Sequence, residues 1–96
     1  MTADNPSPLE LRDQWRQYCR EQKKQQVIID AMTAMTAVVD EAIANGSTSM
    51  LPNYGSPALM AEALRECVSA HRDVQAYFAV RAKNALDAFN AAVQQN

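Results

Sequence analysis

The chain has 96 residues, a formal net charge of −2 at pH 7 and an isoelectric point near 5.2, an acidic balance that disfavours a surface shaped throughout for phosphate backbones. A chain of this length makes one domain, expected over residues 1–96, and buries only roughly 60 to 65% of the surface that its unfolded form exposes. Seventeen residues are alanines, so large apolar side chains are scarce and a partner or a second copy is expected to be needed.

The first predicted element is a long helix over about residues 8–45. No glycine or proline lies between Leu9 and Asn45, and good helix formers dominate this stretch. Ser7 is suited to cap the helix, Pro8 fits its first position, and Glu10 completes a capping box. Asn45 and the glycine after it tolerate the left-handed conformation that closes a helix.

Alternating steps of four and three residues predict which face of this helix is buried. The predicted stripe consists of Leu11, Trp15, Tyr18, Gln22, Gln25, Ile29, Met32, Thr36, Val39 and Ile43. Residues 20–26 offer no apolar face, so this segment is either a solvated part of a continuous helix or the place where the helix breaks. We favour a continuous helix, and we expect this segment to be its least stable part.

The second predicted helix covers about residues 57–94, after a loop at residues 46–55 that contains the chain's two glycines. Ser56 and Pro57 repeat the signal for a helix start. Its predicted stripe consists of Met60, Leu64, Cys67, His71, Val74, Phe78, Ala82, Leu86, Phe89 and Val93, and the steps widen beyond Phe78, which predicts nearly straight packing there. The fold class is therefore all-α, a long antiparallel two-helix hairpin.

No residue pattern indicates catalysis, a metal site or a cofactor. Cys67 and His71 lie one turn apart and form only half of a metal site, and no third group or glycine-rich turn completes a nucleophilic centre. In a simple hairpin residue i faces about residue 102 − i, which places Cys19 near position 83 and far from Cys67. We therefore expect free thiols and no enzymatic activity.

Two surfaces are candidates for binding. Met50, Leu51 and Tyr54 form an apolar loop tip and, with three helical aromatics, make up the predicted protein-contact set: Met50, Leu51, Tyr54, Trp15, Tyr18 and Phe89. The second surface is a basic ridge on the first helix that is suited to nucleic acid, formed by Arg12, Arg16, Arg20, Lys23 and Lys24. Interleaved acids lower the charge of that ridge, and pairing between residues four apart on a solvated helix explains the same pattern. The acidic loop end opposite a basic open end favours head-to-tail contact between copies.

Residues 52–60 and the helix after them resemble the needle subunits of bacterial type III secretion systems, which are helical hairpins with a proline-containing loop. The matching stretch reads Pro52, Asn53, Tyr54, Gly55, Ser56, Pro57, Ala58, Leu59 and Met60. The resemblance implies a subunit that polymerises through its C-terminal helix and is held soluble beforehand by chaperones. The first helix is longer than is usual in that family, and the chain contains cysteines.

The sequence thus favours a non-enzymatic helical protein that acts through self-assembly or binds a helical partner. A nucleic-acid-binding module and a phage or bacterial inhibitor remain the alternatives. No apolar run approaches the roughly 20 residues that a membrane span needs, and residues 1–8 lack the pattern of a cleaved signal peptide. The expected location is the cytoplasm, or outside the cell by export without a cleaved signal.

Overall fold

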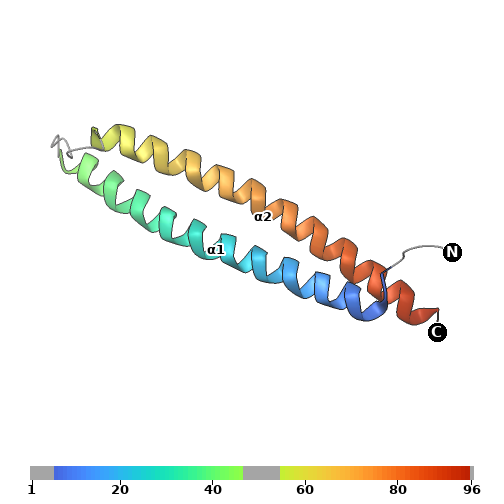
Figure 1. Cartoon of the computed structure of the whole chain (residues 1–96). Coiled ribbons are helices and arrows are strands. Elements are labelled where there is room, and N and C mark those ends of the chain that lie inside the picture. The colour runs from blue at the N-terminus through green and yellow to red at the C-terminus, as the bar shows by residue number, and fades with distance from the viewer. Residues whose placement is uncertain (1–5, 47–54, 96) are drawn as a thin grey trace. The chain divides into compact units, whose positions relative to one another are not determined.

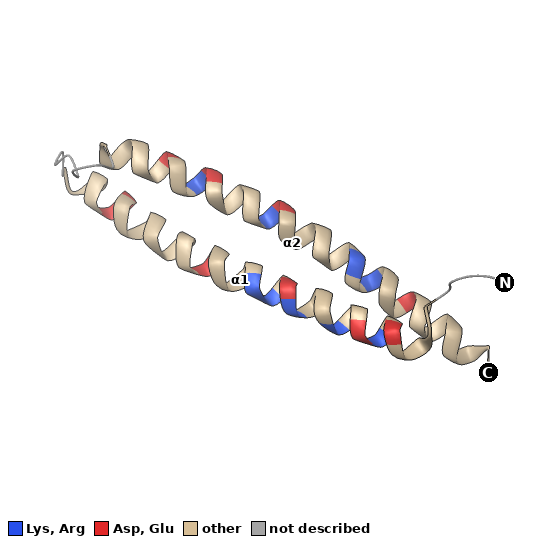
Figure 2. Ribbon diagram, in the orientation of Figure 1, with Lys and Arg blue, Asp and Glu red and all other residues tan. Residues whose placement is uncertain are grey.

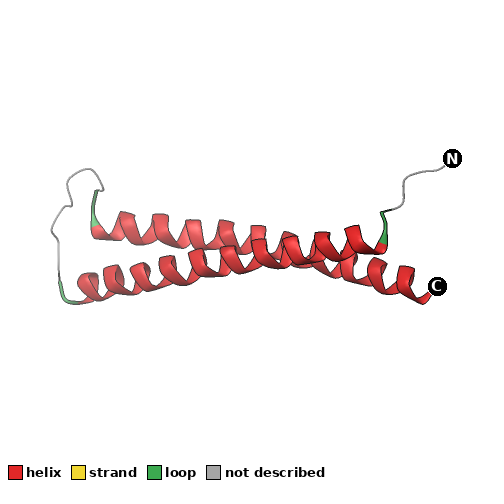
Figure 3. Ribbon diagram, turned by 60° about the horizontal axis from the view of Figure 1, so that its bottom comes forward, coloured by secondary structure: helices red, strands yellow, loops and turns green. Residues whose placement is uncertain are grey.

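The computed structural model describes residues 6–46 and 55–95, and it confirms the all-α fold class (Figure 1). Two helices, α1 (Pro8–Ala44) and α2 (Pro57–Gln94), run antiparallel and pack against each other as a helical hairpin. Each is a single uninterrupted helix (Figure 3). The predicted bounds differ from the observed ones by one residue, at the end of α1.

The helix ends have the expected capping chemistry. Ser7 Oγ accepts a hydrogen bond from the Glu10 main-chain N–H at 3.2 Å, and Ser56 Oγ accepts one from the Leu59 N–H at 3.2 Å. After α1, Gly46 adopts a φ of 80°, and its N–H donates to the Ile43 carbonyl oxygen at 3.0 Å. A residue with a Cβ is disfavoured at this φ, so the glycine fixes where α1 stops.

The chain divides into two compact units, and both helices contribute to each. Unit 1 comprises Met1–Lys24 and Val74–Asn96, and unit 2 comprises Gln25–Asp73. Among the described residues, the buried apolar side chains of unit 1 are Leu11, Ala82 and Ala85, and those of unit 2 are Ile29, Ala61 and Val68. Half of these are alanines, so the core of each unit is thin.

The stripe predicted for α1 is confirmed. Nine of its ten residues are buried or half-buried, and the exception is Ile43, which is 39% exposed near the end of the helix. The helix also continues through residues 20–26, where Gln22 and Gln25 are half-buried.

The stripe predicted for α2 is wrong at three positions. Cys67, Val74 and Val93 are exposed, and the stripe contains the next or preceding residue instead. Met60 and Leu86 are half-buried, beside the buried Ala61 and Ala85. The observed stripe consists of Pro57, Ala61, Leu64, Val68, His71, Gln75, Phe78, Ala82, Ala85, Phe89 and Ala92. Its steps of four and three continue to the end of the helix, so the predicted widening is also wrong. The prediction took apolar Cys67, Val74 and Val93 at these three positions, whereas a helix that packs on one face buries whatever residue lies there.

The polar segment of α1 packs against polar residues of α2. In unit 2, His71 Nδ1 donates to Gln25 Oε1 at 2.6 Å, and in unit 1 Gln75 Nε2 donates to the Gln22 carbonyl oxygen at 3.4 Å. Tyr18 meets Phe78 in unit 1, with ring centroids 6.3 Å apart. These neighbours lie five or six positions earlier on α2 than the simple hairpin register predicts. The observed register brings polar residues to polar ones, because an unpaired buried amide is costly.

Candidate protein-contact site

In unit 2, the two helices form a groove along one side of their shared stripe, and this groove contains the charged side chains between them. The groove has a volume of about 610 Å³, and its lining comes from both helices: Thr33, Thr36, Ala37 and Asp40 on α1, and Val68, Arg65, Ser69, Arg72 and Asp73 on α2. Arg65 crosses it and donates to both carboxylate oxygens of Asp40, at 2.5 and 2.6 Å. We call this the polar side of unit 2.

The opposite side of unit 2 carries no charged residue. The groove is lined by one flank of the α1 stripe and one flank of the α2 stripe. Helical periodicity therefore places the other flank of each stripe on the opposite side of unit 2. On α1 these are Val27, Ile28, Ala31, Met35, Val38 and Ala42. On α2 they are Leu59, Met60, Ala63, Cys67 and Ala70. We call this set the apolar side of unit 2.

The apolar side is largely uncovered. Val27 is 68% exposed, Val38 67%, Leu59 56% and Met35 49%. Isolated exposed apolar residues are common on proteins, but here they recur on neighbouring turns of two packed helices. Exposed apolar side chains therefore recur along this side of both helices.

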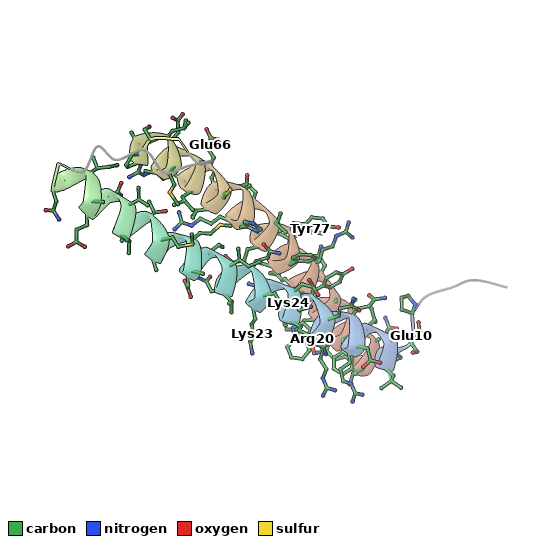
Figure 4. All side chains as sticks on the ribbon, turned by 60° about the vertical axis from the view of Figure 1, so that its left-hand side comes forward. Glu10, Arg20, Lys23, Lys24, Glu66 and Tyr77 are labelled. Atoms are coloured by element: carbon green, nitrogen blue, oxygen red, sulfur yellow. The ribbon has the colours of Figure 1, made fainter. Side chains whose placement is uncertain are left out.

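The outer surface of unit 2, which faces away from the stripe, is acidic. Its charged residues are Asp30 and Glu41 on α1, and Glu62 and Glu66 on α2. Figure 4 shows Glu66 on the outer face of α2, and Figure 2 shows no Lys or Arg along the unit 2 part of α1. Residues 25–73 hold six acids and two arginines, which gives a net charge of −4 with His71 neutral. Of these acids, Glu41 lies one turn from Val38 and Glu66 lies one turn from Ala63 and Ala70, so the outer border of the apolar side is negative there.

Unit 1 contains the predicted basic ridge. Arg16, Arg20, Lys23 and Lys24 are exposed and Arg12 is half-buried. Lys24 pairs with Glu21 at 3.1 Å, and Arg12 lies 3.8 Å from Asp13. The other three cations border a shallow hollow of about 430 Å³ beside Trp15 and Cys19, and Lys23 extends away from α2 (Figure 4).

The aromatic residues of unit 1 divide between packing and surface. Trp15, Tyr18 and Phe89 are half-buried in the stripe, so their predicted role as contact residues stays a prediction. Tyr77 is 52% exposed, and the Arg81 guanidinium lies over its ring, 5.1 Å from the centroid. The remaining predicted contact residues, Met50, Leu51 and Tyr54, lie outside the described residues.

Both cysteines are free, Cys19 half-buried and Cys67 exposed. His71, one turn after Cys67, is half-buried and hydrogen-bonded to Gln25 of the other helix. Within residues 6–46 and 55–95, no group of three or more His, Cys, Asp or Glu side chains is placed to hold a metal ion. Neither described helix combines the length and apolarity that crossing a membrane requires.

Comparisons with protein-family models, with curated proteins and with solved structures find no match to this chain. The candidate site therefore depends on the chain's own geometry. Sequence reasoning missed the apolar side because it followed only the stripe and the loop tip. The signal was nevertheless present: the residues on one flank of each stripe are uncharged from Val27 to Ala42 and from Leu59 to Ala70.

Proposed function

We propose that the chain is a non-enzymatic helical protein that acts through protein contacts, by self-association or by binding a helical partner. The observation that carries this proposal is the apolar side of unit 2. It extends over both helices, contains no ionisable carboxylate, lysine or arginine, and leaves valine, leucine and methionine side chains in water.

Unit 2 leaves large apolar side chains in water on its apolar side, while its own core is thin. Burying an exposed valine, leucine or methionine contributes about 1.5 to 3 kcal/mol, and the apolar side offers four such side chains that are about half exposed or more. The core of unit 2 contains only Ile29, Ala61 and Val68 as buried apolar residues among those described. A partner that covers the apolar side thus buries apolar surface that the hairpin itself leaves in water. An amphipathic helix that binds in an apolar groove does the same.

Sedimentation velocity tests the proposal. The chain is run over a wide concentration range, alone and mixed with a synthetic helical peptide whose apolar stripe is bordered by serine and glutamine. We expect a faster-sedimenting species in at least one series, and Met35→Glu should abolish it because a charge then enters the contact. Thr33→Glu, on the polar side of the same helix, is the matched control and should leave the species intact. A chain that stays monomeric in both series contradicts the proposal.

A second candidate, binding of nucleic acid by unit 1, has its own supporting observation. Arg16, Arg20 and Lys23 have no ion-pair partner among the described residues, and they border the hollow beside Trp15. Cations beside an aromatic ring suit a phosphate backbone with stacked bases. Fluorescence anisotropy with a labelled single-stranded oligonucleotide tests this candidate. We expect weak binding whose logarithmic association constant falls with the logarithm of the salt concentration, with a slope of roughly −0.7 per phosphate contact. An affinity unchanged by Arg16→Gln with Arg20→Gln excludes it.

The similarity to secretion needle subunits and the inhibitor alternative both stay predictions. Residues 52–54 of the resembling stretch lie outside the described residues. Gly55 and Ser56 precede α2, and the remaining residues form the start of α2 at Pro57.

A further inference from the structure

We infer that the apolar side of unit 2 receives an amphipathic helix of another protein whose apolar stripe is bordered by lysine or arginine. This inference rests on the proposed function and specifies the partner's chemistry. It follows from the shape of the apolar side and from the charges at its borders.

The apolar side suits one helix lying between α1 and α2. The residues nearest the stripe, among them Met35 and Met60, form its floor, and methionine adapts to varied apolar shapes. Ala31, Ala63 and Ala70 lie farther out, where their small side chains allow close approach. Along α1 the surface runs from Val27 to Ala42, a length of about 24 Å at 1.5 Å per residue. A partner helix of about four turns therefore covers it.

Charge decides which helix fits. A charged group on the partner's stripe would be desolvated against a surface that offers no counter-charge, so the stripe must be apolar. The partner's flanks meet the outer surface of unit 2, where Glu41 on α1 and Glu66 on α2 are exposed. Cations on those flanks gain attraction, whereas a second copy of unit 2 would bring the same acids and be repelled. The borders thus favour a basic partner over a copy of the same surface.

Three synthetic peptides test the inference. They share one Leu and Ala stripe of about four turns and differ only in the flanking residues, which are Lys, Gln or Glu. At low ionic strength we expect the Lys-flanked peptide to bind at least tenfold more tightly than the Glu-flanked one, with the Gln-flanked peptide between them. The difference should shrink at 1 M salt, where the screening length is about 3 Å.

The exposed thiol of Cys67 reports where the peptide binds. In a Cys19→Ser chain, Cys67 is the remaining thiol, and its alkylation by neutral iodoacetamide should slow as the Lys-flanked peptide is added. The matched control moves the thiol to the polar side: Ser69→Cys, with Cys19→Ser and Cys67→Ser, should react at the same rate with and without peptide. Glu41→Lys with Glu66→Lys should reverse the peptide ranking, because the two border positions then carry positive charge. The fold should be retained, since both side chains are exposed and neither belongs to the stripe.

Each other outcome has a separate meaning. Equal protection by all three peptides overturns the basic-partner inference and leaves the proposed function intact. Protection of Cys67 by increasing chain concentration alone makes a second copy the occupant, which also overturns the inference but not the function. No protection in any series, with a monomeric chain throughout, overturns both.

Discussion

Unit 1 and unit 2 use the same spacing of buried residues but differ in what flanks it. In unit 1 the stripe carries aromatic residues such as Tyr18 and Phe78, and lysine and arginine lie on its surface. In unit 2 the stripe is aliphatic around Ile29, and one flank is wholly uncharged. The difference teaches that the stripe determines how α1 meets α2, whereas the flanking positions determine what each unit presents to other molecules. The following variants test whether the two units really divide in this way.

The largest loss of stability is expected when the most buried large side chain of each unit is truncated. Ile29→Ala in unit 2 and Leu11→Ala in unit 1 should each lower the free energy of unfolding by about 2 to 4 kcal/mol, since the side chains are 3% and 8% exposed. Urea denaturation followed by circular dichroism measures this. Val27→Ala, on the apolar side, is the control and should change stability by less than about 0.5 kcal/mol. A Val27→Ala loss as large as that of Ile29→Ala would mean that the apolar side is already covered in the isolated chain.

The next effect comes from replacing a buried alanine of each unit by a larger residue. Ala61→Leu should cost about 1 to 3 kcal/mol, because Ala61 is 1% exposed and no space is left for a larger side chain. Ala85→Leu makes the same change in unit 1, where Ala85 is 6% exposed. Ala63→Leu is the exposed control on the same helix as Ala61 and should be nearly neutral. If Ala85→Leu is tolerated while Ala61→Leu is not, unit 1 is the more loosely packed of the two.

A smaller effect is expected at the polar pair of unit 2. Gln25→Ala and His71→Ala should each cost about 1 kcal/mol, and the double variant less than their sum, because each single change leaves the other polar group unpaired. Gln22→Ala is the matched change in unit 1. It keeps the main-chain carbonyl that accepts from Gln75, so it should cost less. Strict additivity of Gln25→Ala and His71→Ala would show that their contact does not stabilise the fold.

The sequence predicted the helices well because their signals are local. Ser7 and Ser56 cap the helices as expected, and Gly46 ends α1 with a positive φ. The absence of glycine and proline within either stretch was enough to predict their continuity. The α1 stripe was also predictable, because its apolar residues already fall on steps of four and three.

The register and the α2 stripe were not predictable in the same way, because they depend on which residues of the two helices meet. Val74 is more apolar than Gln75, yet Gln75 lies in the stripe and hydrogen-bonds to Gln22. The candidate site also depends on which residues of α2 face α1. Only when the stripe of α2 is placed at Val68 and not at Cys67 do the flanks of both helices sort into a polar and an apolar side of unit 2.

The smallest expected effect separates the ion pairs of the two units. Asp40→Asn in unit 2 should cost about 0.2 to 1 kcal/mol, since Asp40 holds Arg65 of the other helix by two hydrogen bonds but both side chains are about half exposed. Lys83 and Asp87 in unit 1 lie on one helix, 2.8 Å apart, and their side chains are 75% and 59% exposed. The hydrogen bond from Lys83 to Asp87, with their charge attraction, raises the pKa of Lys83, so the pair is intact at neutral pH and is lost only as the pH rises through that pKa. Because both side chains are mostly exposed, Asp87→Asn should change the urea midpoint at pH 7 only slightly, while the lysine titration seen by NMR shifts to lower pH. The stability lost by Asp40→Asn should be smaller in 1 M salt, because salt screens the ion pair. If Asp87→Asn lowers stability as much as Asp40→Asn does, an ion pair between the two helices stabilises the fold no more than a pair within one helix.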